Sequence, residues 1–251
     1  MNVHIDLKTE TRQCPDHGEF TSRNFLGTVW SKCPACNQAA ADKEAAEKQA
    51  ADRQNELQRW QLRIGGAGIP ERFQSRGLDN FDATTPGQQH ALDFARSFAA
   101  SFDAKERKGL SAIFVGRPGT GKTHIAVGIG MHLLRQNRPV LFTTVMRAIR
   151  RVKDTWAKGS EESESQAIAA LVYPELLILD EVGVQFGSEF EKNILFDVLN
   201  ERYEKRRSTL LMSNLSLEEV KGYLGERIFD RMREDGGRYI PFEWGSHRGK
   251  A

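Results

Sequence analysis

The residues best suited to chemistry form one short run, GRPGTGKT, at Gly116–Thr123. It follows an apolar stretch typical of a buried strand and precedes a helix-like stretch, the setting in which glycines curl a loop around phosphate. Backbone N–H groups and the helix N-terminus would face the phosphates, Lys122 would reach the β- and γ-phosphates, and Thr123 would hold Mg²⁺. The alternative is an ordinary glycine-rich turn. The predicted nucleotide-binding residues are Gly116, Arg117, Pro118, Gly119, Thr120, Gly121, Lys122, Thr123 and His124.

Two acids and an amide are predicted to lie beside this loop. Asp180 and Glu181 follow the apolar run LLIL, at the carboxyl end of a strand, where open α/β folds bind ligands. Asp180 would hold Mg²⁺ through water, and Glu181 would orient or deprotonate the attacking water. Asn214 ends the next strand and would lie between these carboxylates and the γ-phosphate. The alternatives are solvated loop acids and a turn-forming asparagine.

Four residues near the N-terminus have the spacing of metal ligands. CPDH gives Cys14 and His17, CPAC gives Cys33 and Cys36, and 15 residues separate the two pairs. Such pairs match a tetrahedral zinc site, and a hairpin of residues 19–25 and 27–32 fits between them. Because all four ligands are protein groups, the site is predicted to be structural, and metal would stabilise a segment too small for a large core. The alternative is three unrelated thiols and a chance histidine.

A third feature is the basic stretch VMRAIRRVKDTWAKG at Val145–Gly159, in a chain whose net charge is only +2. Its basic and aromatic residues are Arg147, Arg150, Arg151, Lys153, Trp156 and Lys158. Charge alone favours a solvated helix whose bases pair with the acidic stretch EESES at Glu161–Ser165, because charge runs are usually solvated faces.

The elements that position these residues alternate along the chain. Apolar strands at 111–116, 139–144, 175–181 and 208–214 are separated by helical stretches, which predicts an α/β fold with a parallel sheet flanked by helices. Residues 1–38 are predicted to form a zinc-ribbon-like domain, 39–66 a linker helix, and 67–251 the nucleotide-binding domain. The longest apolar runs are strand-sized and no signal pattern precedes them, which predicts a cytoplasmic protein outside the membrane.

The core resembles the DnaC family of bacterial and phage helicase loaders, a branch of the AAA+ P-loop ATPases that also includes the IstB transposition ATPases. The resemblance covers some 180 residues in the family's order: AGIPERF, LDNF, GRPGTGKTHIA, DTW, LLILDEVGVQ, SNLSLEE, LGERIFDRMR and FEWGSHR. It implies binding of ATP or ADP with Mg²⁺, self-association into a spiral or hexamer, and a DnaB-like hexameric replicative helicase and single-stranded DNA as partners.

The resemblance also implies roles for individual residues. Asn214 is the sensor residue, Arg227 the arginine finger that reaches a neighbour's γ-phosphate, and Arg231 a second basic contact; the alternative is two surface arginines on one helix face. In such proteins an extra helical element at the position of the basic stretch lines the inside of the assembly. Its bases would therefore follow the phosphates of single-stranded DNA, with Trp156 stacked on a base.

Three functions are compatible with these features. The favoured one is an ATP-dependent loader of the replicative helicase, with weak ATP hydrolysis that a partner regulates. The second is an IstB-type ATPase that binds duplex DNA for a transposase. The third is a zinc-dependent DNA-binding regulator with an ATPase switch. The N-terminal metal motif departs from the helical helicase-binding domain of the loader that the core most resembles, so the motif bears on the choice of partner.

Overall fold

A computed structural model describes residues 8–25, 27–104, 109–183, 189–234 and 237–247. The chain divides into two compact units, Met1–Gln61 and Leu62–Ala251. Among the described residues, no helix combines the length and the apolar character needed to cross a bilayer.

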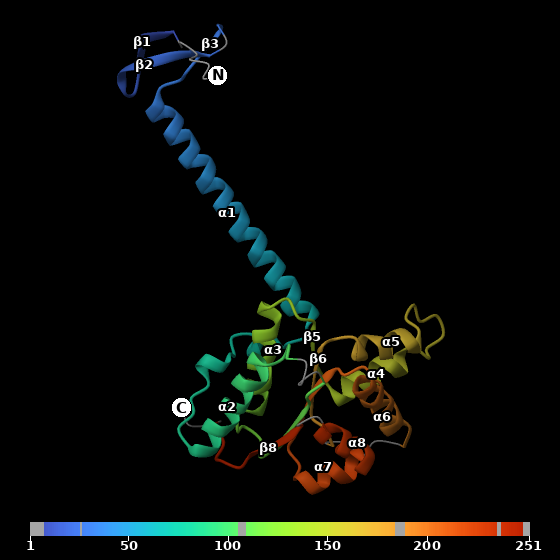
Figure 1. The fold of residues 1–251 in the computed structure, drawn as a ribbon. Coiled ribbons are helices and arrows are strands. Elements are labelled where there is room, and N and C mark those ends of the chain that lie inside the picture. The colour runs from blue at the N-terminus through green and yellow to red at the C-terminus, as the bar shows by residue number, and fades with distance from the viewer. Residues whose placement is uncertain (1–7, 26, 105–108, 184–188, 235–236, 248–251) are drawn as a thin grey trace, which may run out of the picture. The chain divides into compact units, whose positions relative to one another are not determined.

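The first unit is a small antiparallel sheet followed by a long helix (Figure 1). Strands β1 (Thr9–Cys14), β2 (Gly18–Phe25) and β3 (Val29–Trp30) pair in sequence order, and α1 runs from Pro34 to Gly66. The predicted hairpin is confirmed by the pairing of β2 with β3. Sequence reasoning missed β1, because TETRQC has no apolar alternation. It also placed the start of the helix about four residues too late. In the structure α1 begins at Pro34, and Cys36 lies in its first turn.

The second unit contains the predicted parallel sheet. Its strands run in the order β5 (Val140–Thr144), β6 (Leu176–Asp180), β7 (Ser208–Ser213), β4 (Ala112–Gly116) and β8 (Arg238–Phe242), and every neighbouring pair is parallel. The aliphatic residues of β4 and β6 are buried on both faces, as continuous apolar runs predict. The edge strand β8 was missed, because RYIPF is short and contains a proline.

Helices cover both faces of this sheet (Figure 1). On one face α2 (Pro86–Ala100) and α3 (Lys122–Arg135) pack together, and the short turns η1 (Glu71–Phe73) and η2 (Leu78–Asn80) lie beside α3. On the other face the core contains side chains of α4 (Val145–Asp154), α5 (Glu164–Val172), α6 (Glu189–Glu204), α7 (Leu217–Leu224) and α8 (Glu226–Arg233). The α/β prediction is therefore confirmed.

One buried charge ties this second layer to the sheet, and sequence reasoning missed it. Arg202 of α6 is fully buried. Its guanidinium donates to the carbonyl oxygens of Leu171, Val172 and Pro174 at 2.8–3.0 Å, to the carbonyl of Ser208, and to Thr209 Oγ1 at 2.9 Å. Two of these carbonyls end α5, where backbone acceptors have no partner within the helix. Arg202 thus closes the C-terminus of α5 from inside the core.

Candidate functional site

The loop after β4 has a backbone shape that only glycine allows at two positions. Gly116 has φ 141° and Gly121 has φ 97°. A Cβ atom at Gly116 would lie 2.2 Å from the Phe242 carbonyl oxygen, and one at Gly121 would lie 2.7 Å from Phe81 Cε2. Both contacts are far below van der Waals distance, so this close approach requires glycine.

Lys122 is the first residue of α3 and is buried inside the loop. Its Nζ donates to the carbonyl oxygens of Gly116 at 2.6 Å and Arg117 at 2.9 Å. These acceptors are neutral, so they hold the ammonium in place without cancelling its charge. A fixed positive charge at a helix N-terminus is suited to binding a phosphate.

Asp180 and Thr123 come together at the ends of β6 and the loop. Thr123 Oγ1 donates to Asp180 Oδ2 at 3.2 Å, and the Glu181 N–H donates to Asp180 Oδ1 at 2.8 Å. Burial raises the pKa of Asp180, against the opposing effects of these hydrogen bonds and of the Lys122 charge. A hydroxyl and a partly buried carboxylate in contact are the oxygen donors that Mg²⁺ prefers, so the residues present fit this ion.

Glu181 and Asn214 lie on two loops that a buried hydroxyl joins. Ser213 Oγ donates to the Val182 carbonyl oxygen at 2.6 Å and accepts from the Leu215 N–H at 3.1 Å. Glu181 has φ 63°, a left-handed conformation that is costly for a residue with a Cβ and is held here by its neighbours. Sequence reasoning missed Ser213, because only the tertiary structure shows that its hydroxyl bridges the two loops.

A cavity of about 490 Å³ gathers most of the predicted nucleotide site. It is lined by Pro118, Gly119, Gly121, Lys122, Thr123, His124, Asp180, Glu181 and Asn214. Gly116, Arg117 and Thr120 belong to the loop but do not line the cavity. Sequence reasoning assigned no role to several other lining residues, Arg72, Phe73, Arg76, Asn80, Phe81, Asp82 and His247, although most of them fall in the motifs that carry the family resemblance.

His124 lines this cavity and also holds one of its walls. Its Nε2 lies 3.0 Å from the Gly77 carbonyl oxygen and 2.8 Å from Asn80 Oδ1. Asn80 Oδ1 also accepts from the Gly77 N–H at 2.9 Å, so it is an acceptor and the His124 proton lies on Nε2. Burial lowers the pKa of His124. The ring therefore favours its neutral form and ties α3 to the turn at η2.

Arg227, the predicted arginine finger, and Arg231, the predicted second basic contact, lie at a different cavity of about 590 Å³. It shares no residue with the nucleotide cavity. Arg227 is exposed, with its guanidinium 5.7 Å from the centre of the Phe196 ring. Arg231 is half-buried and lies 4.7 Å from the centre of the Tyr203 ring. The structure thus keeps both residues away from the nucleotide cavity of their own chain.

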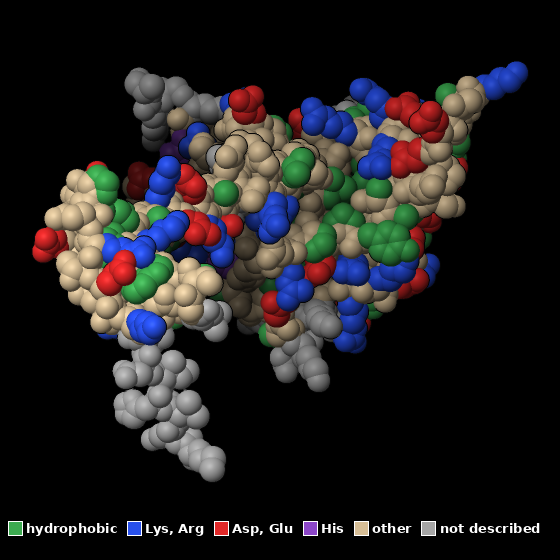
Figure 2. Space-filling view, turned by 90° about the horizontal axis from the view of Figure 1, so that it is seen from above, with side chains coloured by type: hydrophobic (Ala, Val, Ile, Leu, Met, Phe, Trp, Pro, Cys, Tyr) green, Lys and Arg blue, Asp and Glu red, His purple; other side chains and the backbone are tan. Residues whose placement is uncertain are grey.

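The basic stretch forms α4 and the turn after it, and part of its charge is paired with the acidic stretch. Arg151 makes an ion pair with Glu162 at 2.6 Å, and the Trp156 indole N–H donates to Glu164 Oε2 at 2.6 Å. Trp156 is 46% exposed. Figure 2 shows the same mixing on the face it displays, where Lys and Arg side chains lie among Asp and Glu. These contacts are the ones that a solvated helix predicts.

The remaining bases of the stretch divide into paired and unpaired. Lys153 pairs with Glu191 of α6 at 3.3 Å. Within the described part of the chain, the side chains of Arg147, Arg150 and Lys158 have no ion pair or hydrogen bond, and all three are exposed. Three of the five bases are therefore available to an anionic ligand.

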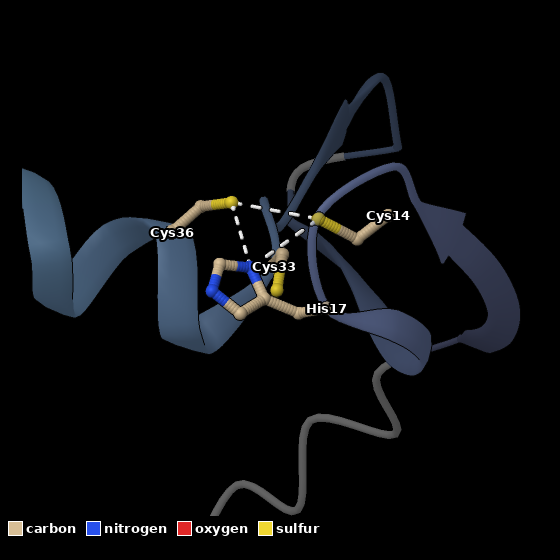
Figure 3. Close-up of side chains that lie close together, drawn as sticks. All are labelled: Cys14, His17, Cys33 and Cys36. Atoms are coloured by element: carbon tan, nitrogen blue, oxygen red, sulfur yellow. Dashed lines mark hydrogen bonds between the residues drawn. The ribbon is translucent and has the colours of Figure 1, made fainter.

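The four predicted metal ligands converge in the first unit (Figure 3). Cys14 ends β1, His17 lies in the following turn, and Cys33 and Cys36 stand just before and within the first turn of α1. Their ligand atoms all lie within 4.8 Å of one another. The closest pairs are 3.4–3.6 Å apart. Tetrahedral zinc with N and S ligands separates such atoms by about 3.5–3.8 Å, so the residues fit the metal.

The thiols of this cluster have unequal pKa values. Hydrogen bonds from the Asp16 backbone and the His17 side chain lower the pKa of Cys14 to about 6. The hydrogen bond with Cys14 and burial raise the pKa of Cys36 to about 11. Crowded thiols do not ionise together without a compensating cation, and zinc would supply that charge. The group would be structural, because its four ligands leave no open position.

An inner strand, β4, leads into a glycine-rich phosphate loop, and one strand away β6 carries Asp180 and Glu181 at its carboxyl end. This arrangement defines a P-loop nucleotide-binding protein with an AAA+ fold. The model of the family described as IstB-like ATP binding protein matches residues 46–232. The chain belongs to this DnaC/IstB family, which makes it an ATP-binding protein with the capability of an ATPase. The matched range begins after the cysteine and histidine ligands.

Named relatives cover most of the chain. It is 35% identical over 197 residues to the replicative helicase loader DnaC of Escherichia coli K12, which covers 78% of this chain and 79% of that protein. It is 35% identical over 195 residues to the replicative helicase loader DnaC of Buchnera aphidicola subsp. Schizaphis graminum, covering 78% of each.

Solved structures share the fold. A crystal structure of the DnaC helicase loader matches with a TM-score of 0.60 at 23% identity, covering 68% of this chain and 99% of that one. A crystal structure of DnaI matches with a TM-score of 0.58 at 21% identity, covering 72% and 94%.

Proposed function

We propose that this protein is an ATP-dependent loader of the replicative DNA helicase onto single-stranded DNA, acting in the cytoplasm during initiation or restart of replication. The observation that carries the proposal is the 35% identity with replicative helicase loaders over 78% of the chain. The nucleotide cavity supports it, because residues of the loop, the lysine and the two acids line the same space.

In this proposal ATP binds in the nucleotide cavity, and the protein hydrolyses it weakly, at a rate that a partner regulates. The loop N–H groups and Lys122 bind the phosphates, and Thr123 and Asp180 hold Mg²⁺, which would neutralise developing charge on the phosphates. Glu181 orients the attacking water, and Asn214 senses the γ-phosphate from the neighbouring strand end. The contact between Thr123 and Asp180 supports their joint role.

The proposed active unit is an assembly of several copies. Arg227 and Arg231 act on the nucleotide of a neighbouring copy. Their position supports this role, because the cavity that they line has no residue in common with the nucleotide cavity of their own chain. Single-stranded DNA is bound along α4 and the turn after it through Arg147, Arg150 and Lys158, whose side chains make no ion pair among the described residues. Arg151, Lys153 and Trp156 join only if DNA displaces Glu162, Glu191 and Glu164.

The N-terminal unit is proposed to select the partner. We propose residues 1–38 as a zinc-binding domain, 39–66 as a linker helix and 67–251 as the ATPase domain. Zinc held by Cys14, His17, Cys33 and Cys36 would stabilise the small sheet. The buried residues in its described part are only Cys14, Ser22, Asn24 and Cys33. Because the family match begins at residue 46, this unit is the part of the chain that differs from the shared core.

The test is complex formation with the hexameric replicative helicase encoded by the same genome. The wild-type protein should form a complex with the helicase in ATP and load it onto single-stranded DNA, and Lys122→Ala should lose the dependence on ATP. The absence of any complex, with or without ATP, would contradict the proposal. A preference for duplex over single-stranded oligonucleotides would instead favour a transposition ATPase.

A further inference from the structure

The segment that follows β8 packs against the phosphate loop. The Trp244 indole N–H donates to the Thr120 carbonyl oxygen at 2.8 Å. The His247 backbone N–H donates to the Gly119 carbonyl oxygen at 2.9 Å. Figure 1 shows the chain leaving β8 and running toward α2. Two consecutive carbonyls of the loop are therefore bound by residues more than a hundred positions away in the sequence.

These two bonds fix the direction of the N–H groups in the loop. In a trans peptide the C=O and N–H of one unit point in opposite directions. The Gly119 carbonyl shares its peptide with the Thr120 N–H, and the Thr120 carbonyl shares its peptide with the Gly121 N–H. Bonds that hold both carbonyls toward the segment after β8 therefore direct both N–H groups away from that segment, and Gly119 and Gly121 line the nucleotide cavity.

The segment is itself anchored at both ends. At its start the Phe242 backbone lies so close to Gly116 that no Cβ fits there, and the Phe242 and Trp244 rings are 4.8 Å apart. At its end His247 Nε2 lies 2.9 Å from Nε2 of the buried Gln88. The Gln88 Oε1 atom accepts from the backbone and hydroxyl of Thr84 and from the Thr85 N–H. This fixes the amide orientation, so Gln88 donates and His247 accepts.

We propose that residues 242–247 form a clamp on the phosphate loop, and that Trp244 and His247 are positioning residues for nucleotide binding. The proposal rests on the nucleotide site described above and adds residues from the far end of the chain to it. The clamp acts by preorganisation, because a loop whose N–H groups already face the phosphates loses less conformational freedom on binding. Its ligand is the polyphosphate chain rather than the base.

The test compares Trp244→Phe, which keeps the ring and removes one N–H donor, with Trp30→Phe, the same change at a half-buried tryptophan of the first unit. Binding of ATP and of inorganic triphosphate, each with Mg²⁺, is measured by calorimetry. Loss of one net hydrogen bond should weaken both ligands by roughly 3- to 10-fold in Trp244→Phe. Trp30→Phe should bind both as the wild type does.

A second variant and a stability measurement separate this role from a general loss of folding. His247→Ala keeps the backbone N–H but loses the Gln88 contact, so it should weaken both ligands by a smaller factor. Amide hydrogen exchange at Thr120 and Gly121 should become faster in both variants while exchange in β6 stays unchanged. Wild-type affinity in Trp244→Phe, in a protein where Lys122→Ala abolishes binding, would overturn the clamp alone. Failure of the wild type to bind ATP would overturn the nucleotide site itself.

Discussion

Replacing Arg202 by methionine should destabilise the second unit severely without touching the nucleotide site. Methionine keeps the aliphatic part of the side chain but leaves four carbonyl oxygens, those of Leu171, Val172, Pro174 and Ser208, without this donor. A buried acceptor that loses its partner costs about 1–3 kcal/mol. The lower end of that range, summed over four acceptors, gives about 4 kcal/mol.

Two effects bear on this sum. Burial lowers the pKa of Arg202 to about 9, so the guanidinium is still charged at neutral pH, and its removal relieves an unfavourable desolvation. Local relaxation and water also recover part of the loss. We therefore expect a net decrease of about 2–4 kcal/mol in the free energy of unfolding, which in a unit of this size corresponds to a melting temperature lower by roughly 10 °C.

The assay is thermal and urea unfolding of wild type, Arg202→Met and Arg202→Lys. Lysine restores the charge but offers one ammonium to acceptors in two segments, 171–174 and 208–209, so it should recover about half of the loss. Below its unfolding transition Arg202→Met should bind ATP with wild-type affinity, because its contacts lie at the amino ends of β6 and β7. An unfolding free energy within about 1 kcal/mol of wild type would refute the reasoning.

Three further predictions test the site and its supports. Asp180→Asn should abolish Mg²⁺-dependent hydrolysis yet raise the melting temperature of the nucleotide-free protein at pH 7. Burial raises the pKa of Asp180 above its ordinary 3.8. The stability that the neutral acid contributes is therefore present below pH 3.8 and is lost as pH rises through the folded pKa. Because asparagine stays neutral at every pH, the gain in melting temperature should shrink as pH falls. Gly222→Ala, in α7 with open space around it, should stabilise by up to about 1 kcal/mol in urea unfolding, whereas the same change at Gly128 should destabilise, because the new Cβ would lie 2.8 Å from Leu78 Cδ2 and 3.0 Å from Leu78 N. Cys33→Ser should lower the bound zinc measured by metal analysis and unfold the small sheet, while the ATP affinity of the second unit stays within about twofold; full zinc content in this variant would exclude Cys33 as a ligand.

Sequence reasoning succeeded where the determining interactions are local or strongly patterned. The phosphate loop is eight contiguous residues whose glycines and lysine act on their own backbone, so its position followed directly from the motif. The cysteine and histidine pairs did the same for the predicted metal site, because each pair lies within one turn. Strands β4, β5, β6 and β7 were predicted correctly, because burial on both faces of a sheet demands continuous apolar runs.

Only the tertiary structure decided the contacts between distant segments. Trp244 reaches the Thr120 carbonyl across 124 positions, and Arg202 binds carbonyls that precede it by 28–31 positions. Such partners depend on the spatial order of the strands and on backbone acceptors, and backbone carbonyls leave no trace in residue types. The pairing of Arg151 with Glu162 is equally a matter of how a chain turns between two helices. The sequence by itself therefore determined the side chains of the phosphate loop and of the cysteine and histidine group. The tertiary structure decided what holds the loop in shape and which positive charges remain available.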